Sequence, residues 1–349
     1  MNEPKISVVI PLYNRKYFAE ECISSVLNQT FRDFEIVIRD DFSNDGVFEF
    51  VEKIFSAEIS SRKIKLFRNL ENIGESATLK KLFKDATGKY ITILHNDDLY
   101  LPYALQHLYE VAENFQADVV HGTGSLFSSQ DRNNLTKIFH DKHNVENIEL
   151  MPDNLNFRFN EWLSGGIFQD AQYNIFRRNF LFESNIFSEM DDCENFLFSL
   201  MWIMRAKIFV KTPEIFYIRR DSPDSQTNEK AFSSKRLEKT VSSQIKLFGQ
   251  VDKFISNFDF FCDNKIFDYL IKTKIFIAQE NLSNDNLHMT GNRDYAELYK
   301  VTENIFKKFF GSNGVYLALL YHWGHIMQFK KSEAKKLLSD CLKILDSDI

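Results

Sequence analysis

Cysteine, glycine and proline are scarce in this sequence. Its 349 residues include 4 Cys, 12 Gly and 6 Pro. The cysteines, Cys22, Cys193, Cys262 and Cys341, lie far apart and form no CxxC pair, which argues against a zinc site or a disulfide framework and fits a reducing compartment. The low Gly and Pro content argues against fibrous or disordered classes. A globular chain remains, 44% hydrophobic and long enough for one large domain and a smaller one.

Membrane and secretion signals are missing as well. The most apolar stretch, residues 315–329, contains two histidines and is shorter than the roughly 20 residues that a transmembrane helix needs. The start of the chain enters a strand-like pattern without the basic segment, apolar run and small-residue cleavage site of a signal peptide. We therefore expect a cytoplasmic protein.

Charge is distributed unevenly along the chain. Residues 1–229 hold 25 Lys and Arg against 35 Asp and Glu, whereas residues 230–349 hold 18 against 14. The acidic part is a poor nucleic-acid surface, so no nucleic-acid partner is expected. The mildly basic part could contact an anionic membrane at its inner face, or its charges could simply cover solvated helix faces.

Apolar segments alternate with amphipathic ones through the first two thirds of the chain. Strands are expected at residues 5–11, 34–38, 64–67, 89–94, 117–122 and 213–220, and helices at about 18–27, 47–55, 76–86, 103–115 and 191–206. This alternation predicts βαβ units and a mainly parallel sheet flanked by helices, an α/β fold. Beyond residue 228 the apolar residues recur at helical spacing. We therefore expect an α/β domain over 1–228 and a C-terminal α-helical domain over 229–349.

Polar residues follow three of the expected strands. They are Asn14 and Arg15, then Asp40 and Asp41, then Asp97 and Asp98. Ligands of parallel α/β sheets bind at the carboxyl ends of the strands, so these residues mark a candidate site. The adjacent carboxylates of Asp97 and Asp98 repel each other, and Mg²⁺ or Mn²⁺, which also binds diphosphate oxygens, would neutralise them. Alternatively, this pair caps the next helix.

Several motifs together resemble family 2 glycosyltransferases. They are ISVVIPLYN at 6–14, SSVLNQTF at 24–31, DDFSND at 40–45, NIG at 72–74 and GKYI at 88–91, followed by the pair at 97–98. The resemblance extends from residue 5 to about residue 225. Within the family, the sequence resembles the bacterial enzymes that build surface polysaccharides. It implies a GT-A fold, Rossmann-like in type. It also implies a metal-dependent, inverting transfer of a sugar from a nucleoside-diphosphate donor, with UDP or dTDP favoured. The acceptor would be a saccharide or a lipid-linked saccharide in capsule or lipopolysaccharide synthesis.

The resemblance also implies roles for individual residues. Asp41 would accept a hydrogen bond from the nucleobase, with Asp40 beside it. Asp98 would be the direct ligand of Mn²⁺ or Mg²⁺, and Asp97 would lie nearer the ribose or the donor sugar. The remaining donor-binding candidates are Pro11, Tyr13, Asn14, Asn72, Gly74, Lys80 and Asn96.

The sequence departs from the family pattern at two places. The family often writes its acidic element as Asp-x-Asp-Asp, but His95 and Asn96 precede the pair here, so the first carboxylate is absent. Leu79 stands where an arginine is usual. Lys80 or Lys81 could supply point charges instead, without the planar fork of arginine.

A general base is expected at the start of the helix near residue 191, where family members carry it. Asp192 is favoured, and Asp191 and Glu194 are alternatives. Another register places Asn195 at this position, and asparagine cannot act as a base. Upstream, the segment from Trp162 to Asp170 could shape an acceptor pocket, or Trp162 could be an ordinary core residue.

Two other functions remain open. The missing arginine and the altered acidic element would also suit a catalytically degenerate, nucleotide-binding scaffold. A nucleotidyltransferase is a weaker alternative, because it would usually show a glycine-rich phosphate loop and residues 12–15 contain no glycine. The C-terminal helices could bind acceptor, form a homodimer or approach the membrane.

Overall fold

The computed structural model describes residues 3–122, 126–128, 147–163, 166–167, 170–184, 186, 195–220, 247, 250–251 and 253–260. The chain divides into two compact units. The first comprises Met1–Arg158 and Ile167–Ser222, and the second comprises Phe159–Gly166 and Pro223–Ile349. The helical domain expected over residues 229–349 lies almost wholly outside the described residues, and that expectation stays a prediction.

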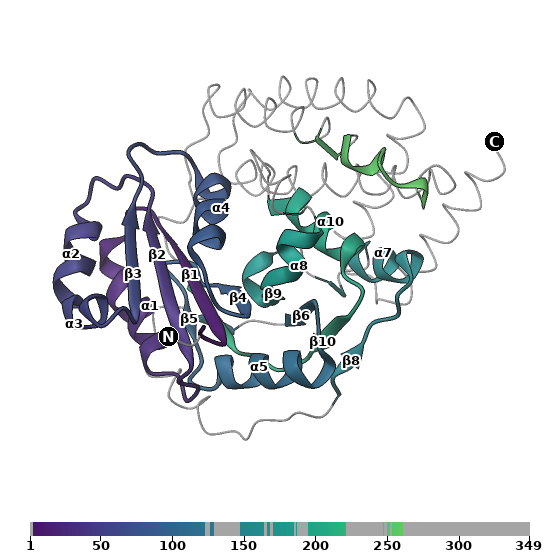
Figure 1. Ribbon diagram of the computed structural model, residues 1–349, viewed down its shortest axis with the longest axis horizontal. Coiled ribbons are helices and arrows are strands. Elements are labelled where there is room, and N and C mark those ends of the chain that lie inside the picture. The colour runs from purple at the N-terminus through teal and green to yellow at the C-terminus, as the bar shows by residue number, and fades with distance from the viewer. Residues whose placement is uncertain are drawn as a thin grey trace, which may run out of the picture. The chain divides into compact units, whose positions relative to one another are not determined.

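An eight-stranded sheet forms the centre of the first unit (Figure 1). Its strands, in spatial order, are β3 (Ile64–Arg68), β2 (Phe34–Asp40), β1 (Ile6–Leu12), β4 (Tyr90–Ile93), β9 (Asn174–Arg177), β6 (Val119–Gly122), β10 (Phe209–Thr212) and β8 (Glu149–Leu150). Strand β1 pairs in parallel with β2 and β4, and β2 pairs in parallel with β3. Strand β9 runs antiparallel to β4 and β6, and β8 runs antiparallel to β10. The expected mainly parallel sheet is confirmed.

Helices follow the strands in the expected alternation. They are α1 (Lys16–Leu27), α2 (Val47–Ile54), α3 (Ser56–Ser60), α4 (Glu75–Asp85), α5 (Ala104–Phe115), α7 (Leu155–Leu163), α8 (Arg178–Glu183) and α10 (Asn195–Arg205), with a short 3-10 turn, η1 (Ala171–Tyr173). In α1, Ala19, Cys22, Ile23 and Val26 are buried, which is the three-to-four spacing of an amphipathic helix. Within the described residues, no helix has the length and apolar character needed to cross a bilayer.

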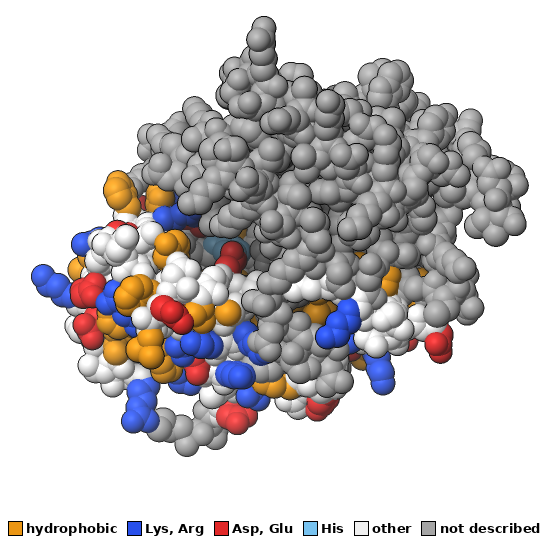
Figure 2. All heavy atoms as spheres, turned by 90° about the horizontal axis from the view of Figure 1, so that it is seen from above, with side chains coloured by type: hydrophobic (Ala, Val, Ile, Leu, Met, Phe, Trp, Pro, Cys, Tyr) orange, Lys and Arg blue, Asp and Glu red, His pale blue; other side chains and the backbone are white. Residues whose placement is uncertain are grey.

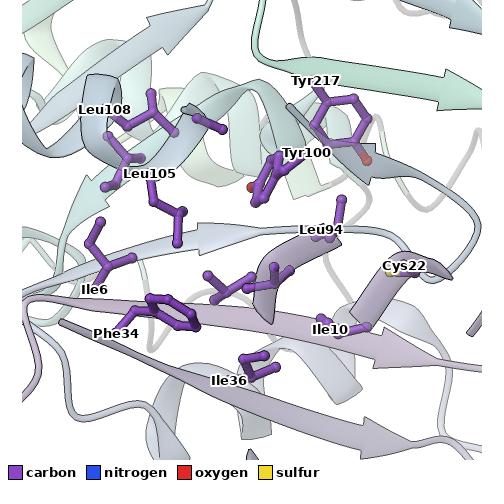
Figure 3. Close-up of a cluster of buried hydrophobic side chains, with 14 of the residues drawn as sticks. Ile6, Ile10, Cys22, Phe34, Ile36, Leu94, Tyr100, Leu105, Leu108 and Tyr217 are labelled. Carbon is purple, nitrogen blue, oxygen red and sulfur yellow. The ribbon is translucent and has the colours of Figure 1, made fainter. Parts of the chain in front are cut away.

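The two faces of the sheet bury different helices. Ile6, Val8 and Ile10 of β1 belong to a buried cluster shared with α1, α2 and α5. Figure 3 shows Ile6 and Ile10 in this cluster. Val9 lies on the opposite face because side chains alternate along a strand, and α4 packs there against β1 and β2. The rings of Phe83 in α4 and Phe198 in α10 lie 6.1 Å apart, so α10 covers the same face.

A second, three-stranded sheet lies beside the acidic pair. Its order is β5 (Leu99–Tyr100), β11 (Tyr217–Arg220) and β7 (Leu126–Ser128). Strand β11 pairs antiparallel with β5, with Tyr217 opposite Tyr100. Residues 97 and 98 immediately precede β5, so this pairing brings β11 to the end of β4.

Two expectations from the sequence were wrong. The strand expected over 213–220 forms only in its second half, as β11 (Tyr217–Arg220), and the unexpected strand β10 ends at Thr212, before Pro213, in the other sheet. Proline has no N–H for a strand ladder, which explains the break. The alternative that Asp97 and Asp98 cap a helix is also wrong. Strand β5 follows them, and α5 begins at Ala104 with Tyr103 at its N-cap.

The surface of the described part mixes residue types. Figure 2 shows hydrophobic side chains scattered among charged side chains of both signs on one face.

Candidate functional site

Asn14 ties together the loops that follow three neighbouring strands. Its backbone N–H donates to Ser43 Oγ at 2.8 Å, and its side-chain Oδ1 accepts from the N–H of Asn44 at 3.2 Å. Its carbonyl oxygen accepts from Asn96 Nδ2 at 3.0 Å. The loops after β1, β2 and β4 therefore form one hydrogen-bonded network. The expected convergence of these three loops at the carboxyl edge of the sheet is confirmed.

The turn between β1 and α1 has a left-handed backbone. Asn14 has φ 55° and Arg15 has φ 59°. This conformation costs about 1–2 kcal/mol for an ordinary L-residue and less for asparagine. Such strain persists where surrounding contacts fix the backbone, and it concentrates at functional sites. Here the Asn14 network and an ion pair of Arg15 provide those contacts.

Asp97 and Asp98 are both buried, and the negative charge of each is balanced by different partners. Arg15 Nη1 forms an ion pair with Asp97 Oδ2. Asp98 Oδ2 accepts a hydrogen bond from the Tyr217 hydroxyl at 2.7 Å, and its Oδ1 accepts from the Arg220 N–H at 2.8 Å. Asp97 is thus neutralised by a cation from the β1 loop, whereas Asp98 is held by hydrogen bonds from β11.

His95 lies among carboxylates next to this pair. Its Nδ1 is 3.5 Å from Glu75 Oε1. Burial acts to lower the pKa of His95, but the charges of Glu75, Asp98, Asp97 and Asp170 outweigh it and raise the pKa. Burial, together with the charge of Asp97, raises the pKa of Asp98. The end of β4 is therefore a strongly acidic environment that favours positive charge.

Asp40 shapes the turn after β2. It is fully buried, and its carboxylate accepts bonds from the N–H and the hydroxyl of Ser43. Arg68 Nε lies 3.0 Å from its Oδ2. Burial raises the pKa of Asp40, against the opposing effect of Ser43 and Arg68. These contacts give Asp40 a structural role, and its contact with a nucleotide stays a prediction.

Asp41 organises the loop before α4. Its Oδ1 accepts from Asn69 Nδ2 and from the N–H of Ile73, both at 2.9 Å, and its Oδ2 accepts from the N–H of Gly74 at 2.8 Å. Both oxygens are therefore engaged within the protein. The contact between Asp41 and a nucleobase stays a prediction. A nucleobase N–H would have to donate to the lone pair that remains on Oδ2.

The loop and first turns of α4 carry the other predicted donor contacts. Gly74 has φ 84° and ψ 163°, a conformation that essentially only glycine adopts, and Asn72 is exposed. Leu79, which the resemblance sets against an arginine, is buried and packs into the core. Of the two candidate lysines, Lys81 contacts the Asp41 network, with Nζ 3.2 Å from Asn69 Oδ1. Lys80 is half-buried, and its predicted role is unchanged.

The residues at the end of β4 fit a cation that arrives with a diphosphate. Within the described ranges, no group of three or more His, Cys, Asp or Glu side chains could hold a metal ion by itself. Mg²⁺ is usually bound by one or two carboxylates together with substrate phosphates and water, rather than by a cage of protein ligands. Asp97 and Asp98 match that donor set.

The predicted general bases, Asp191, Asp192 and Glu194, lie outside the described residues. The structure does describe α10, which begins directly after them at Asn195. The buried guanidinium of Arg158 holds the other end of this helix by donating to the carbonyl oxygens of Ile203 and Ala206, and it also bonds Lys207. Arg158 therefore fixes the C-terminal end of α10.

Two further candidates differ in exposure. Tyr13 is 46% exposed beside the Asn14 network and can reach a ligand. Trp162, by contrast, is fully buried and packs edge-on against Phe159, with ring centroids 6.3 Å apart. For Trp162 the core alternative is confirmed. Pro11 is half-buried in β1, opposite Arg39 of β2.

Sequence reasoning missed the residues that compensate the acidic pair. Arg15 was visible as a cation in a polar loop, but nothing in the sequence pairs it with Asp97, 82 residues away. Tyr217 and Arg220 approach Asp98 only because β11 pairs with β5. No local signal could have identified them.

Comparisons with known proteins identify relatives over much of this chain. EpsE of Bacillus subtilis, a putative glycosyltransferase, is 36% identical over 123 residues, which cover 35% of this chain and 44% of EpsE. EpsJ of the same bacterium, an uncharacterized glycosyltransferase, is 28% identical over 251 residues, 70% of each chain. The GalNAc(5)-diNAcBac-PP-undecaprenol beta-1,3-glucosyltransferase of Campylobacter jejuni is 31% identical over 148 residues, 42% of this chain and 46% of that enzyme. The matches thus span less than half of EpsE and of the Campylobacter enzyme.

The fold also has a counterpart among solved structures. The crystal structure of S. aureus TarS 1-349 in complex with UDP-GlcNAc superposes with a TM-score of 0.51 at 17% sequence identity, covering 80% of this chain and 82% of that one. This likeness confirms the GT-A fold. The sequence model described as Glycosyl transferase family 2 matches residues 7–184, half of the chain. The protein therefore belongs to glycosyl transferase family 2.

Proposed function

We propose that this glycosyltransferase moves a sugar, with inversion, from a UDP- or dTDP-linked donor to a saccharide or lipid-linked acceptor in surface polysaccharide synthesis, such as capsule or lipopolysaccharide. The observation that carries the proposal is the Asn14 network, which joins the acidic pair to the loops after β1 and β2. The name of the Campylobacter relative, which acts on an undecaprenol-linked saccharide, and the UDP-GlcNAc complex of TarS support the proposed substrate classes.

The chemistry follows from inversion. An acceptor hydroxyl attacks the anomeric carbon from the face opposite the nucleotide, the new C–O bond forms, and the bond to the diphosphate oxygen breaks. A carboxylate takes the hydroxyl proton as the bond forms. We assign this role to Asp192, with Asp191 and Glu194 as alternatives, because they precede α10 as the family pattern requires.

The leaving diphosphate needs positive charge. Asp98 and Asp97 would hold Mn²⁺ or Mg²⁺, and the ion, when bound, would neutralise the charge that develops on the departing diphosphate. The protein itself prepares this edge of the sheet. Tyr217 and the N–H of Arg220 orient Asp98, and Asn96 is fixed on the carbonyl oxygen of Asn14.

The proposed location is the cytoplasm, at the inner face of the cell membrane, where a lipid-linked acceptor would be presented. The basic charge of residues 230–349 supports a peripheral contact of that segment with anionic lipid. The same segment is the proposed site of a homodimer.

A donor screen tests the proposed function. Thermal shifts of the full chain would be measured with UDP-, dTDP-, GDP- and CDP-sugars in the presence of Mn²⁺, followed by turnover assays with each stabilising donor. We expect one nucleotide class to stabilise the protein and to be hydrolysed or transferred. Binding without turnover across a range of acceptors would favour a nucleotide-binding scaffold instead.

A further inference from the structure

Arg15 uses only a small part of its hydrogen-bonding capacity. A guanidinium carries five N–H donors. Within the part of the chain that the structure describes, this one bonds to Asp97 Oδ2 through Nη1 alone. The side chain keeps 24% of its surface exposed. An arginine anchored by one donor at the edge of a site presents its remaining donors to a ligand.

The start of helix α1 does not explain the position of Arg15. Its backbone is left-handed, which is unfavourable for arginine, and its side chain makes no capping bond to the helix. The first helical N–H, that of Lys16, is satisfied by Asp45 Oδ2 at 2.8 Å. The strained backbone is therefore associated with the placement of the guanidinium on Asp97.

The negative charge around Asp97 and Asp98 means that a diphosphate can bind there only if a cation contacts it. Asp98 and Glu75 would repel an approaching anion, whereas Arg15 already offsets the charge of Asp97. Arginine suits this task because its planar fork binds phosphate oxygens through two parallel N–H bonds. Arg15 already lies against Asp97, so its position is set before any ligand arrives.

We infer that Arg15 binds the diphosphate of the nucleotide donor, with Asp97 as the carboxylate that orients its guanidinium. The inference rests on the proposed function, because it assigns a residue to the donor's diphosphate. It gives Asp97 a second role beside the proposed cation. The arginine that binds phosphate would then come from the loop after β1, and not from α4, where Leu79 replaces the usual arginine.

The test compares ligands that differ in phosphate content. Affinities of the full chain for inorganic pyrophosphate and UDP would be measured by calorimetry, and for uridine by ligand-observed NMR, each with EDTA and with diamagnetic Mg²⁺. The variants are Arg15→Gln, Arg15→Lys and Arg15→Gly, the last of which suits the left-handed backbone and so protects against misfolding. Lys16→Gln is the matched control, because it removes the same charge from the next residue, whose Nζ lies over the Phe50 ring at 5.3 Å.

We expect Arg15→Gln and Arg15→Gly to weaken UDP and pyrophosphate binding by about 10- to 100-fold while uridine binding is unchanged. Arg15→Lys should recover part of the loss, and Lys16→Gln should stay within about twofold of the wild type. The inference is overturned if the glutamine and glycine variants bind UDP and pyrophosphate like the wild type, or lose uridine equally. Failure of the wild-type chain to bind any of the nucleotides in the donor screen would contradict the proposed function as well.

Discussion

The hydroxyl of Tyr217 donates a 2.7 Å hydrogen bond to Oδ2 of Asp98, across 119 residues of sequence. A strand from the end of the α/β unit thereby holds the second carboxylate of the acidic pair. The same strand supplies the N–H of Arg220 to Oδ1. The orientation of Asp98 thus depends on the second sheet as much as on β4.

Tyr217→Phe tests this dependence. The substitution leaves a buried carboxylate oxygen without its donor, so the free energy of unfolding should fall by about 1–3 kcal/mol. The loss would be measured by urea denaturation at pH 7. Tyr17→Phe, at a side chain that is 78% exposed, is the control and should change stability very little. Equal stability of both variants would show that the bond to Asp98 contributes nothing.

Glu35 should make stability depend on acid pH. Its Oε1 accepts from Ser7 Oγ at 2.6 Å and from the N–H of Thr87 at 2.7 Å, and its Oε2 lies 2.7 Å from Lys65 Nζ. Burial acts to raise the pKa of Glu35, but Lys65, Ser7 and Thr87 outweigh it and lower the pKa. The contribution of the ionised group is therefore complete above the pKa of the unfolded chain and is lost as pH falls through the folded value.

The expected difference between wild type and Glu35→Gln is about 1–3 kcal/mol at pH 7, shrinking below about pH 4.5. Denaturation curves at several pH values would measure it. Glu52→Gln, at an exposed position of α2, is the control and should follow the wild type. A difference that stays constant down to pH 3 would contradict the predicted linkage.

Arg158→Met should destabilise the helix that leads from the predicted general base. The substitution keeps an apolar stem but leaves the carbonyl oxygens of Ile203, Ala206 and Lys207 without their donor. We expect a loss of about 2–4 kcal/mol in the free energy of unfolding, measured by denaturation. Lys207→Met removes an exposed charge nearby and should be close to neutral. A neutral Arg158→Met would mean that α10 does not depend on this cap.

Asp192→Asn tests the proposed general base. The amide cannot accept the acceptor's proton, so transfer should fall by at least about 100-fold, while the affinity for the nucleotide should stay near that of the wild type. Initial rates and calorimetry measure the two quantities separately. Turnover close to normal would move the base elsewhere, and Asp191→Asn and Glu194→Gln would then identify which alternative carries it.

The sequence predicted the part of the site that follows from strand order. Apolar runs placed β1, β2 and β4 within about a residue or two, and the rule that parallel strands end at one edge correctly predicted that the loops after these strands meet. Those inferences depend on local composition and on a general property of parallel sheets.

Other parts of the site depend on tertiary contacts that no local pattern encodes. Asp40 and Asp41 are adjacent and chemically identical, yet one turns to Ser43 and Arg68 and the other to the loop before α4. The partners of Asp97 and Asp98 lie 82 and 119 residues away in sequence. Neither the direction of a side chain nor a distant ion pair follows from periodicity.

In the proposed function, the carboxyl edge of the sheet at Asp97 and Asp98 binds a nucleoside-diphosphate donor. The most direct test of this binding is calorimetric titration of the wild type and of an Asp97→Asn, Asp98→Asn double variant with the donor found in the screen, in the presence of Mn²⁺. Circular dichroism would establish that the variant is folded. We predict binding by the wild type and a loss of at least about tenfold in the folded variant. Equal affinity in the two proteins would show that the donor does not bind at Asp97 and Asp98.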